Sequence, residues 1–483
     1  MASTVVGYAV HKGASQGVLA DLLSRTSSTT SIVAAIMDQL ESPMVKPTIP
    51  FIGHIIGIIR YQKGYHRIVH DVNPSVNIAT LPMLNGKMYV VFNPHLIQTI
   101  LRNKIGSFEP FITEFAQKTI GFSVHKFAKT EMLHKMNVHF LTEISAKLGR
   151  VGGHVRTVDI VNSGKETLLN RGLQVDNLYL WCRDVMTLAT SRALYGDHDP
   201  YNEDPSLVEL AQYVTLQAIT SAYYTAEHNL TGPTTSQLVI NRANALRKHS
   251  FTGEEIGLLE AILPVMATVN AVPFTGFRSA AAKMTYNEDG SERTVTFDIA
   301  EFDEQLPLLV SCYWETTRLT NHSVSIRCIM SDHVVRGSDG REYMLKKGTD
   351  IQLPAGVTHN EKSTWGNTAS VFDPERFIPA PTKDKTPESI ETERKKKAAY
   401  FPFGGGRHLC PGCNMAFAEI LGFMSILLLG YEIEAVGMGF ANVEMDIPAL
   451  TTGSVNPKNW GAGLGGRILR RKGWEDVQWH FEC

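Results

Sequence analysis

The feature that most constrains this chain is a glycine-rich segment ending in a cysteine, Phe403-Gly-Gly-Gly-Arg-His-Leu-Cys-Pro-Gly412. Three consecutive glycines allow torsions that other residues avoid, and without a Cβ the backbone can approach a flat ligand closely. The apolar stretch from about 412 to 429 predicts a helix directly after Cys410, which Gly430 is expected to end. Unpaired N–H groups and the helix dipole favour an anion there, so we expect Cys410 to act as a thiolate. A thiolate is a strongly electron-donating axial ligand for haem iron.

The spacing Cys410-Pro-Gly-Cys413 also fits a redox pair or half of a zinc site. A redox pair expects a βαβ setting, and zinc expects a second pair of ligands at a suitable distance; neither is evident in the sequence. We therefore interpret Cys413 as a packed thiol of the core. The six cysteines are scattered along the chain, which argues against a secreted disulfide scaffold and favours a reducing compartment.

The composition is that of a soluble globular protein. Of 483 residues, 43% are hydrophobic and 19% charged, with a net charge of −2, so nothing indicates a nucleic-acid partner. Residues 1–46 contain no run approaching the ~20 apolar residues that span a bilayer. We expect this N-terminal segment to lack a transmembrane helix.

Hydrophobic periodicity predicts a mainly α fold with minor β structure. Long irregular loops are expected over residues 354–411, and loops of that length usually carry function. Strands are expected at Met88–Phe92 and within Ser323–Leu353. The predicted helices are Leu96–Leu101, Leu133–Leu148, Leu178–Leu194 and Glu254–Ala271.

The cysteine segment resembles the haem-binding signature of the cytochrome P450 family. The positions that match are Phe403, Gly406, His408, Cys410 and Gly412, although many members carry Arg where His408 stands. The resemblance implies the cytochrome P450 fold, with a large helical domain, a small sheet-rich region and one catalytic domain over residues 47–483. It also implies haem b with Cys410 as its thiolate ligand. Phe403 would pack beside the sulfur, Gly404 and Gly406 would line the cofactor, and His408 would bind a propionate.

Two further motifs stand in the order that this family requires. Glu315-Thr-Thr-Arg318 lies on a predicted helix, where side chains three apart share a face, and alone it could be a surface ion pair. Asp373-Pro-Glu-Arg-Phe377 follows before Cys410. The resemblance implies that Glu315, Arg318 and Arg376 form a buried charged triad that fixes the loop presenting the cysteine, because buried charges must be paired.

Further cofactor contacts are implied at two places. Arg327 falls where relatives have a propionate partner on a strand, although an exposed strand arginine is an equal alternative. His134 or Lys135, on a predicted helix, is a second candidate.

The helix that handles dioxygen in most members departs from the family pattern. Aligning on Ala267 puts Val269 at the usual acid position and Asn270 at the usual Thr position. Asn can donate and accept hydrogen bonds but cannot relay a proton as a carboxylate does. The ending Asn-Ala-Val-Pro273 resembles the sterol 7- and 12-hydroxylase and prostacyclin synthase branch and many fungal relatives, a branch that contains both hydroxylases and isomerases.

The resemblance implies a haem-thiolate monooxygenase of eukaryotic, fungal type that oxidises an apolar small molecule of terpenoid, sterol, polyketide or alkaloid type in secondary metabolism. The alternative is an isomerase, dehydratase or rearrangement catalyst that needs neither dioxygen nor a reductase. The implied partner is NADPH-cytochrome P450 reductase, with Arg394–Lys397 as either its docking patch or a merely solvated surface. The implied protein is an intracellular monomer, soluble or peripheral at the endoplasmic reticulum. The candidate pocket residues, which could equally be core, are Val265, Met266, Phe108, Phe111, Phe115 and Phe122.

Overall fold

The computed structural model divides the chain into two compact units, and each is described by itself. The first unit comprises Met1–Phe108 and Val324–Thr358, and the second comprises Glu109–Ser323 and His359–Cys483. The single catalytic domain over residues 47–483 therefore stays a prediction. The structure describes residues 40–47, 53–84, 86–111, 114, 173–185, 237–248, 251–253, 256, 294–298, 301–337, 340–379, 386–410, 412–446, 456–474 and 477–482.

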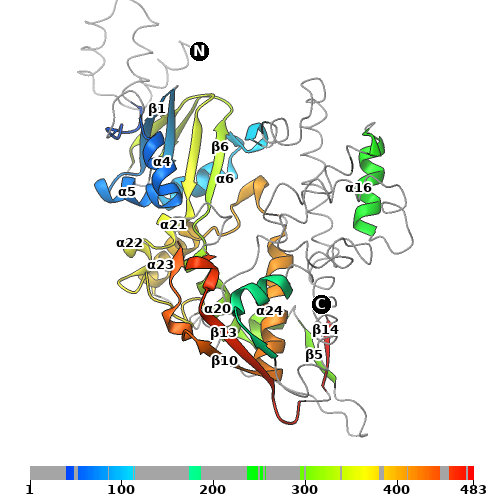
Figure 1. Ribbon diagram of the computed structural model, residues 1–483. Coiled ribbons are helices and arrows are strands. Elements are labelled where there is room, and N and C mark those ends of the chain that lie inside the picture. The colour runs from blue at the N-terminus through cyan, green and yellow to red at the C-terminus, as the bar shows by residue number, and fades with distance from the viewer. Residues whose placement is uncertain are drawn as a thin grey trace, which may run out of the picture. The chain divides into compact units, whose positions relative to one another are not determined.

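The first unit is built on a five-stranded sheet with the order β1-β2-β9-β6-β3 (Figure 1). Neighbouring strands are antiparallel except for β2 and β9, which are parallel. These strands confirm the β structure expected at Met88–Phe92 and within Ser323–Leu353. The strands of this unit, including the β7–β8 hairpin, are β1 (Ile78–Met83), β2 (Gly86–Val91), β3 (Gly106–Ser107), β6 (Val324–Ile329), β7 (His333–Arg336), β8 (Glu342–Leu345) and β9 (Asp350–Pro354).

Short helices accompany this sheet. α6 confirms the helix expected at Leu96–Leu101, and it starts where it does because the side chain of Asn93 accepts a hydrogen bond from the Leu96 N–H, with Pro94 in the first turn. The buried core of the unit joins α5 to the sheet through Tyr65, Val69 and Val90. The helices are α4 (Ile55–Tyr61), η1 (Gln62–Gly64), α5 (Tyr65–Val72), α6 (Pro94–Arg102) and α21 (Ala355–Thr358).

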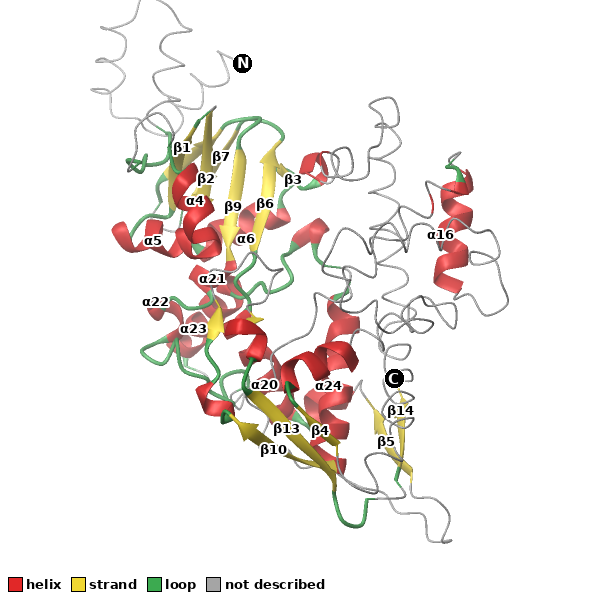
Figure 2. Ribbon diagram, in the orientation of Figure 1, coloured by secondary structure: helices red, strands yellow, loops and turns green. Residues whose placement is uncertain are grey.

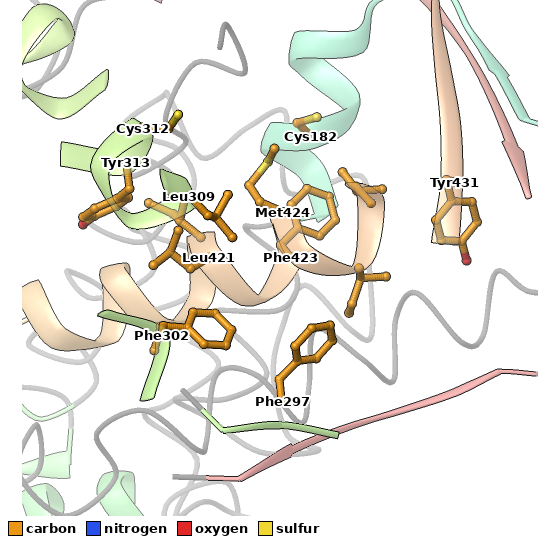
Figure 3. Packing of buried hydrophobic residues seen from close by; sticks show 14 of the residues in the cluster. Cys182, Phe297, Phe302, Leu309, Cys312, Tyr313, Leu421, Phe423, Met424 and Tyr431 are labelled. Carbon is orange, nitrogen blue, oxygen red and sulfur yellow. The ribbon is translucent and has the colours of Figure 1, made fainter. Parts of the chain in front are cut away.

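The second unit has its core between α20 (Pro307–Thr320) and α24 (Cys413–Gly430). Figure 3 shows Leu309 of α20 facing Leu421 and Met424 of α24, and all three side chains are buried. A three-stranded antiparallel sheet, β10-β13-β4, belongs to the same unit (Figure 2). α24 confirms the apolar helix that was expected after Cys410, and it ends where Tyr431 begins β10.

The remaining elements of the second unit are shorter. Residues 178–185 are helical, in agreement with the start of the helix expected at Leu178–Leu194. The mainly α class with minor β structure is confirmed. The other elements are β4 (Leu173–Val175), α16 (Gln237–Lys248), β5 (Thr294–Asp298), α19 (Phe302–Gln305), α22 (Lys362–Trp365), α23 (Pro387–Ala399), η5 (Gly406–His408), β10 (Tyr431–Gly437), η6 (Phe440–Asn442), β11 (Met445–Asp446), β12 (Asn456–Pro457), η7 (Lys458–Gly461), β13 (Leu464–Arg470) and β14 (Gln478–Glu482).

Residues 354–411, where long irregular loops were expected, also contain the short helices α21 and α22 and the longer helix α23, which the sequence analysis did not predict. This helix is charged all round, so it lacks the apolar periodicity on which the prediction depended. Its start carries a different signal: the side chain of Thr386 accepts a hydrogen bond from the Ser389 N–H, and Pro387 occupies the first helical position. Residues of high helix propensity and the packing of Ala399 in a small buried cluster with Trp365 stabilise this helix.

Candidate functional site

The cysteine loop, residues 400–412, runs from the end of α23 to the start of α24. Two backbone hydrogen bonds shape it: the Gly404 N–H donates to the Phe401 carbonyl at 3.0 Å, and the Cys410 N–H donates to the Phe403 carbonyl at 3.0 Å. Gly404 has a φ of +74° and Gly406 a φ of +62°, values that residues with a Cβ rarely adopt. The glycines therefore let the chain fold back and present Cys410 three residues before α24.

The Cys410 side chain is an exposed, free thiol. The protein packed around it raises the pKa of this thiol, the Gly412 N–H lowers it by a hydrogen bond, and Cys413 raises it further. The net effect is a raised pKa of the free thiol, with burial as the largest cause. The helix dipole does not offset it, because α24 begins only at Cys413 and the Cys410 N–H already donates to the Phe403 carbonyl. A coordinated metal ion would supply the missing stabilisation of the thiolate.

These residues fit a thiolate-bound haem. The sulfur of Cys410, a soft donor, is exposed and accepts a hydrogen bond from the Gly412 N–H. The three glycines before it have no side chains that would obstruct a flat cofactor. A Cβ at Gly412 would lie 3.9 Å from the sulfur, an ordinary contact. Across the described ranges, no three His, Cys, Asp or Glu side chains gather in a way that could hold a metal ion directly.

A buried tyrosine lies on the α20 side of the two cysteines. Burial, followed by the charges of Cys413 and Cys410, raises the pKa of Tyr313, and its hydroxyl has no hydrogen-bond partner among the described residues. Its ring packs edge-on against Phe417 of α24, with ring centroids 5.3 Å apart. Cys413 lies one helical turn before Phe417 and is half-buried, so its role as a packed thiol of the core stays a prediction.

The start of the cysteine loop is tied to the end of α20. The side-chain amide of Asn321 donates to the Pro402 carbonyl at 2.7 Å. The Tyr400 hydroxyl donates to the Trp314 carbonyl at 3.1 Å and is hydrogen-bonded to the hydroxyl of Thr317. Burial raises the pKa of Tyr400 well above its ordinary value, so the phenol stays protonated. Two polar anchors of α20 thus fix the loop before it turns toward the cysteine.

A buried histidine provides another anchor. The backbone N–H of Phe401 donates to Nε2 of His359 at 3.1 Å, and both residues are buried. Burial, with smaller effects of His322 and Arg318, lowers the pKa of His359 to about 3, so the imidazole is neutral. A neutral ring with Nε2 as acceptor carries its proton on Nδ1.

The charged triad predicted from the resemblance comes together in the structure. Arg318 donates to both carboxylate oxygens of Glu315, each at 2.7 Å, and Nε of Arg376 donates to Glu315 Oε1 at 3.0 Å. The side chains of Glu315 and Arg318 have no exposed surface, and that of Arg376 is 4% exposed. The guanidinium of Arg318 also lies over the ring of Trp365.

The triad satisfies its remaining donors with backbone carbonyls. Arg318 Nη1 donates to the carbonyls of His359 and Ala369, at 2.6 and 2.8 Å. The Arg376 guanidinium donates to the carbonyls of Trp365, Thr368 and Val371. The cluster therefore holds residues 359–376 against α20. Because every charged group in it is paired and hydrogen-bonded, burying these charges is energetically tolerable.

Other predicted site residues have their own surroundings. In the first unit, Arg327 of β6 is buried, donates to the Ile326 carbonyl and lies over the ring of Phe108. Phe403 and His408 of the cysteine loop are half-buried, as is Phe111. Several predicted residues lie outside the described residues: His134, Phe115, Phe122, Val265, Met266, Ala267, Val269 and Asn270, together with the helix expected at 133–148 and all but residue 256 of the helix expected at 254–271.

The sequence reasoning missed three residues that anchor the cysteine loop. Asn321 directly follows the helix that carries Glu315 and Arg318, and Tyr400 directly follows α23, positions that a more careful reading of helix ends could have singled out. His359 offers no such signal, because a lone histidine in an apolar surrounding is usually an ordinary core residue.

Known proteins resemble this chain over its length. Residues 293–449 match the cytochrome P450 family. A cytochrome P450 monooxygenase of Gibberella zeae is 33% identical over 92% of this chain and 92% of its own length. The cytochrome P450 monooxygenase nodJ of Hypoxylon pulicicidum is 22% identical over 92% of this chain and 93% of its length. The cholesterol 7-alpha-monooxygenase of Cricetulus griseus is 31% identical, but over only 27% of this chain and 25% of its own.

The fold, the glycine-rich cysteine loop and these similarities together define a haem-thiolate oxidoreductase. The chain belongs to the cytochrome P450 family, whose cofactor is a thiolate-bound haem. Its similarity is to fungal monooxygenases over nearly the full length, whereas the likeness to the sterol hydroxylase is local. None of the helices in the described part of the chain combines the length and the apolarity needed to cross a membrane.

Proposed function

We propose that this enzyme is a monooxygenase of fungal secondary metabolism, that Cys410 is the thiolate ligand of its haem, and that its substrate is an apolar small molecule of terpenoid, sterol, polyketide or alkaloid type. The single observation that carries the proposal is the exposed thiol of Cys410 at the end of a loop that three glycines shape and α20 fixes. When bound, the haem supplies activation of dioxygen. The full-length similarity to fungal monooxygenases supports the reaction type.

The residues of the chain would then have distinct roles at the haem and the substrate. Cys410 donates electron density, Phe403, Gly404 and Gly406 flank the sulfur side, and His408, Arg327 and His134 are the proposed propionate partners. The triad of Glu315, Arg318 and Arg376 keeps the segment before the loop in position. Asn270, with Val269 and Ala267, would handle hydrogen bonding at the dioxygen side. The pocket is proposed to include Val265, Met266, Phe108, Phe111, Phe115 and Phe122.

The proposed electron donor is NADPH-cytochrome P450 reductase, with the protein acting as a monomer in the cell, soluble or peripheral at the endoplasmic reticulum. α23 carries the run Arg394–Lys397, and Arg394, Lys395 and Lys397 are exposed. A basic surface of this kind would attract an acidic partner domain. Reversing two of these charges, Lys395→Glu with Lys397→Glu, should slow reduction by the reductase and leave chemical reduction unchanged.

Two spectra test the ligand. The purified holoenzyme should give a strongly red-shifted band when reduced and exposed to carbon monoxide, because Cys410 would supply an anionic sulfur to the haem iron. Cys410→Ala should abolish that band, whereas Cys413→Ala should keep it. Retention of the band in Cys410→Ala would refute the assignment of Cys410. Retention in Cys410→Ala together with loss in Cys413→Ala would assign the ligand to Cys413.

A second candidate function has its own support, because Val269 and Asn270 replace the usual acid and Thr. The enzyme would then isomerise, dehydrate or rearrange a substrate that already carries oxygen, without dioxygen or reductant. Product formation measured with and without a reductase and dioxygen separates the two. Strict dependence on both supports the monooxygenase, and turnover without either supports the alternative.

A further inference from the structure

The first observation concerns the start of the cysteine loop. Phe401 follows the end of α23 and is buried, so its N–H must find a partner within the protein. Its carbonyl accepts the bond from Gly404 that begins the loop. The orientation of the Phe401 peptide therefore determines where the loop starts to turn, and the Cys410 N–H closes the same loop on Phe403.

The second observation is that one residue joins this peptide to the charged triad. The carbonyl of His359 accepts a hydrogen bond from Arg318 Nη1 at 2.6 Å, while its Nε2 accepts the Phe401 N–H at 3.1 Å. Arg318 in turn is held by Glu315. His359 is fully buried, and its ring lies 5.2 Å from that of Tyr400 and 5.5 Å from that of Phe401, between centroids. The connection is short and buried.

The third observation is that the imidazole is retained at a cost. With Nε2 accepting, the proton is on Nδ1, which has no hydrogen-bond partner among the described residues. A buried polar atom without a partner destabilises the folded state. An apolar side chain would avoid that cost but would leave the Phe401 N–H unpaired. The use of histidine here is explained by the acceptor that it supplies.

We propose that His359 is a positioning residue for the haem ligand. It is hydrogen-bonded both to Arg318 of the buried triad and to the Phe401 peptide, and so holds the cysteine loop in the geometry that keeps the Cys410 sulfur bound. The proposal rests on the proposed role of Cys410 as the thiolate ligand. His359 is not a catalytic residue: it acts through Phe401, nine residues before the cysteine. Loss of the His359 imidazole should loosen the loop, so that the Cys410 sulfur would leave the haem iron or take up a proton and become a neutral thiol.

The test uses a matched set of variants of the full-length holoenzyme. His359→Leu removes the acceptor. His359→Gln keeps an acceptor oxygen at a similar reach, whereas His359→Asn has the same amide on a shorter stem that cannot reach. His66→Leu is the control, since His66 is also a buried histidine, but it is hydrogen-bonded to Gln352 in the first unit.

Two readouts are measured besides activity. One is the fraction of the reduced carbonyl complex that keeps the red-shifted thiolate band, and the other is amide hydrogen exchange of the peptide covering residues 400–410. We expect His359→Leu and His359→Asn to lose at least roughly half of the thiolate band, and exchange in the loop to accelerate about tenfold, the factor that corresponds to one buried hydrogen bond. His359→Gln should stay near the wild type on both.

The outcomes are separable. If His359→Leu and His359→Asn keep the thiolate fraction and the loop exchange of the wild type, and only global stability falls as in His66→Leu, the inference is overturned. It is also overturned if His359→Gln behaves like His359→Asn. Should His359→Leu not accumulate as folded protein, the Gln and Asn pair decides alone. The proposed function fails separately, if Cys410→Ala keeps the thiolate band.

Discussion

Among the described residues, Glu315 in the second unit and Glu41 in the first are each paired with two arginine or lysine side chains. In the second unit, Glu315 pairs with Arg318 and Arg376, and no part of its side chain is exposed. In the first unit, Glu41 pairs with Lys87 and Lys346 and accepts a hydrogen bond from the Tyr89 hydroxyl at 2.8 Å, with 17% of its side chain exposed. The charges are the same, but the surroundings differ.

The difference shows what burial does to an ion cluster. Around Glu315 the arginines also donate to five backbone carbonyls of residues 359–371, so the cluster organises a whole segment. Around Glu41 the side chains of Lys87 and Lys346 are 27% and 34% exposed, so water can replace the carboxylate as their partner. A buried cluster becomes destabilising when one member is lost, whereas a half-exposed one weakens gradually.

The largest effect is expected from Glu315→Gln. It leaves the two buried guanidinium groups without an anion, at a cost of about 3–5 kcal/mol. Urea unfolding of the holoenzyme should show a lower midpoint, and haem should be lost more readily because the residues before the cysteine loop are released. Glu41→Gln is the matched control. Equal losses in the two variants would contradict the distinction between the clusters.

A smaller effect is expected from Arg376→Lys. The lysine keeps a positive charge toward Glu315, but it cannot bond the carbonyls of Trp365, Thr368 and Val371 together. We expect a loss of about 1–3 kcal/mol, measured by thermal or urea unfolding. Arg394→Lys on the exposed face of α23, where the arginine pairs with Glu391, should change stability by no more than about 0.5 kcal/mol. A loss as small as this control in Arg376→Lys would refute the backbone role.

The pH dependence of the unfolding free energy should report on the imidazole of His359. The backbone carbonyl of this residue accepts a hydrogen bond from Arg318. The pKa of the imidazole is about 3 in the folded protein because of burial, against about 6.5 when unfolded. Between these values the unfolded chain binds more protons, so His359 makes stability fall as pH falls below about 6.5, by at most about 1.4 kcal/mol per pH unit. His359→Gln should flatten the slope of the unfolding free energy between about pH 5 and pH 7. An unchanged slope would contradict the neutral, buried state.

The smallest effect is expected from Glu41→Gln, about 0.2–1 kcal/mol. Burial acts to raise the pKa of Glu41, but hydrogen bonds from Lys87, Lys346 and Tyr89 together lower it below its ordinary value. The contribution of the pair is therefore present above the unfolded pKa of 4.5 and is lost as pH falls through the folded value. Added salt should shrink the difference between the variant and the wild type in urea unfolding. A salt-independent loss would mean that the cluster is effectively buried.

The sequence predicted the local structure around the candidate site where torsional preference and hydrophobic periodicity decide it. The glycines before Cys410, the apolar helix after it and the strands at Met88–Phe92 and Ser323–Leu353 follow from torsional freedom and hydrophobic periodicity, which need no knowledge of distant residues. The position of α24 was correct to within a residue for the same reason. α23 was missed because its stability depends on a capped start and good helix formers rather than on an apolar face.

The sequence by itself determined that Cys410 follows a glycine-rich segment. It also determined that Glu315, Arg318 and Arg376 precede the cysteine in the order in which the family forms its charged triad. Only the tertiary structure decided what holds that turn. The partners Phe401 and His359 are 42 residues apart, and Arg376 and Glu315 are 61 apart. Pairing over such separations depends on how α20 packs, and on which donors burial leaves without water. Burial likewise raises the pKa of the free Cys410 thiol, an effect of packing that the local sequence does not reveal.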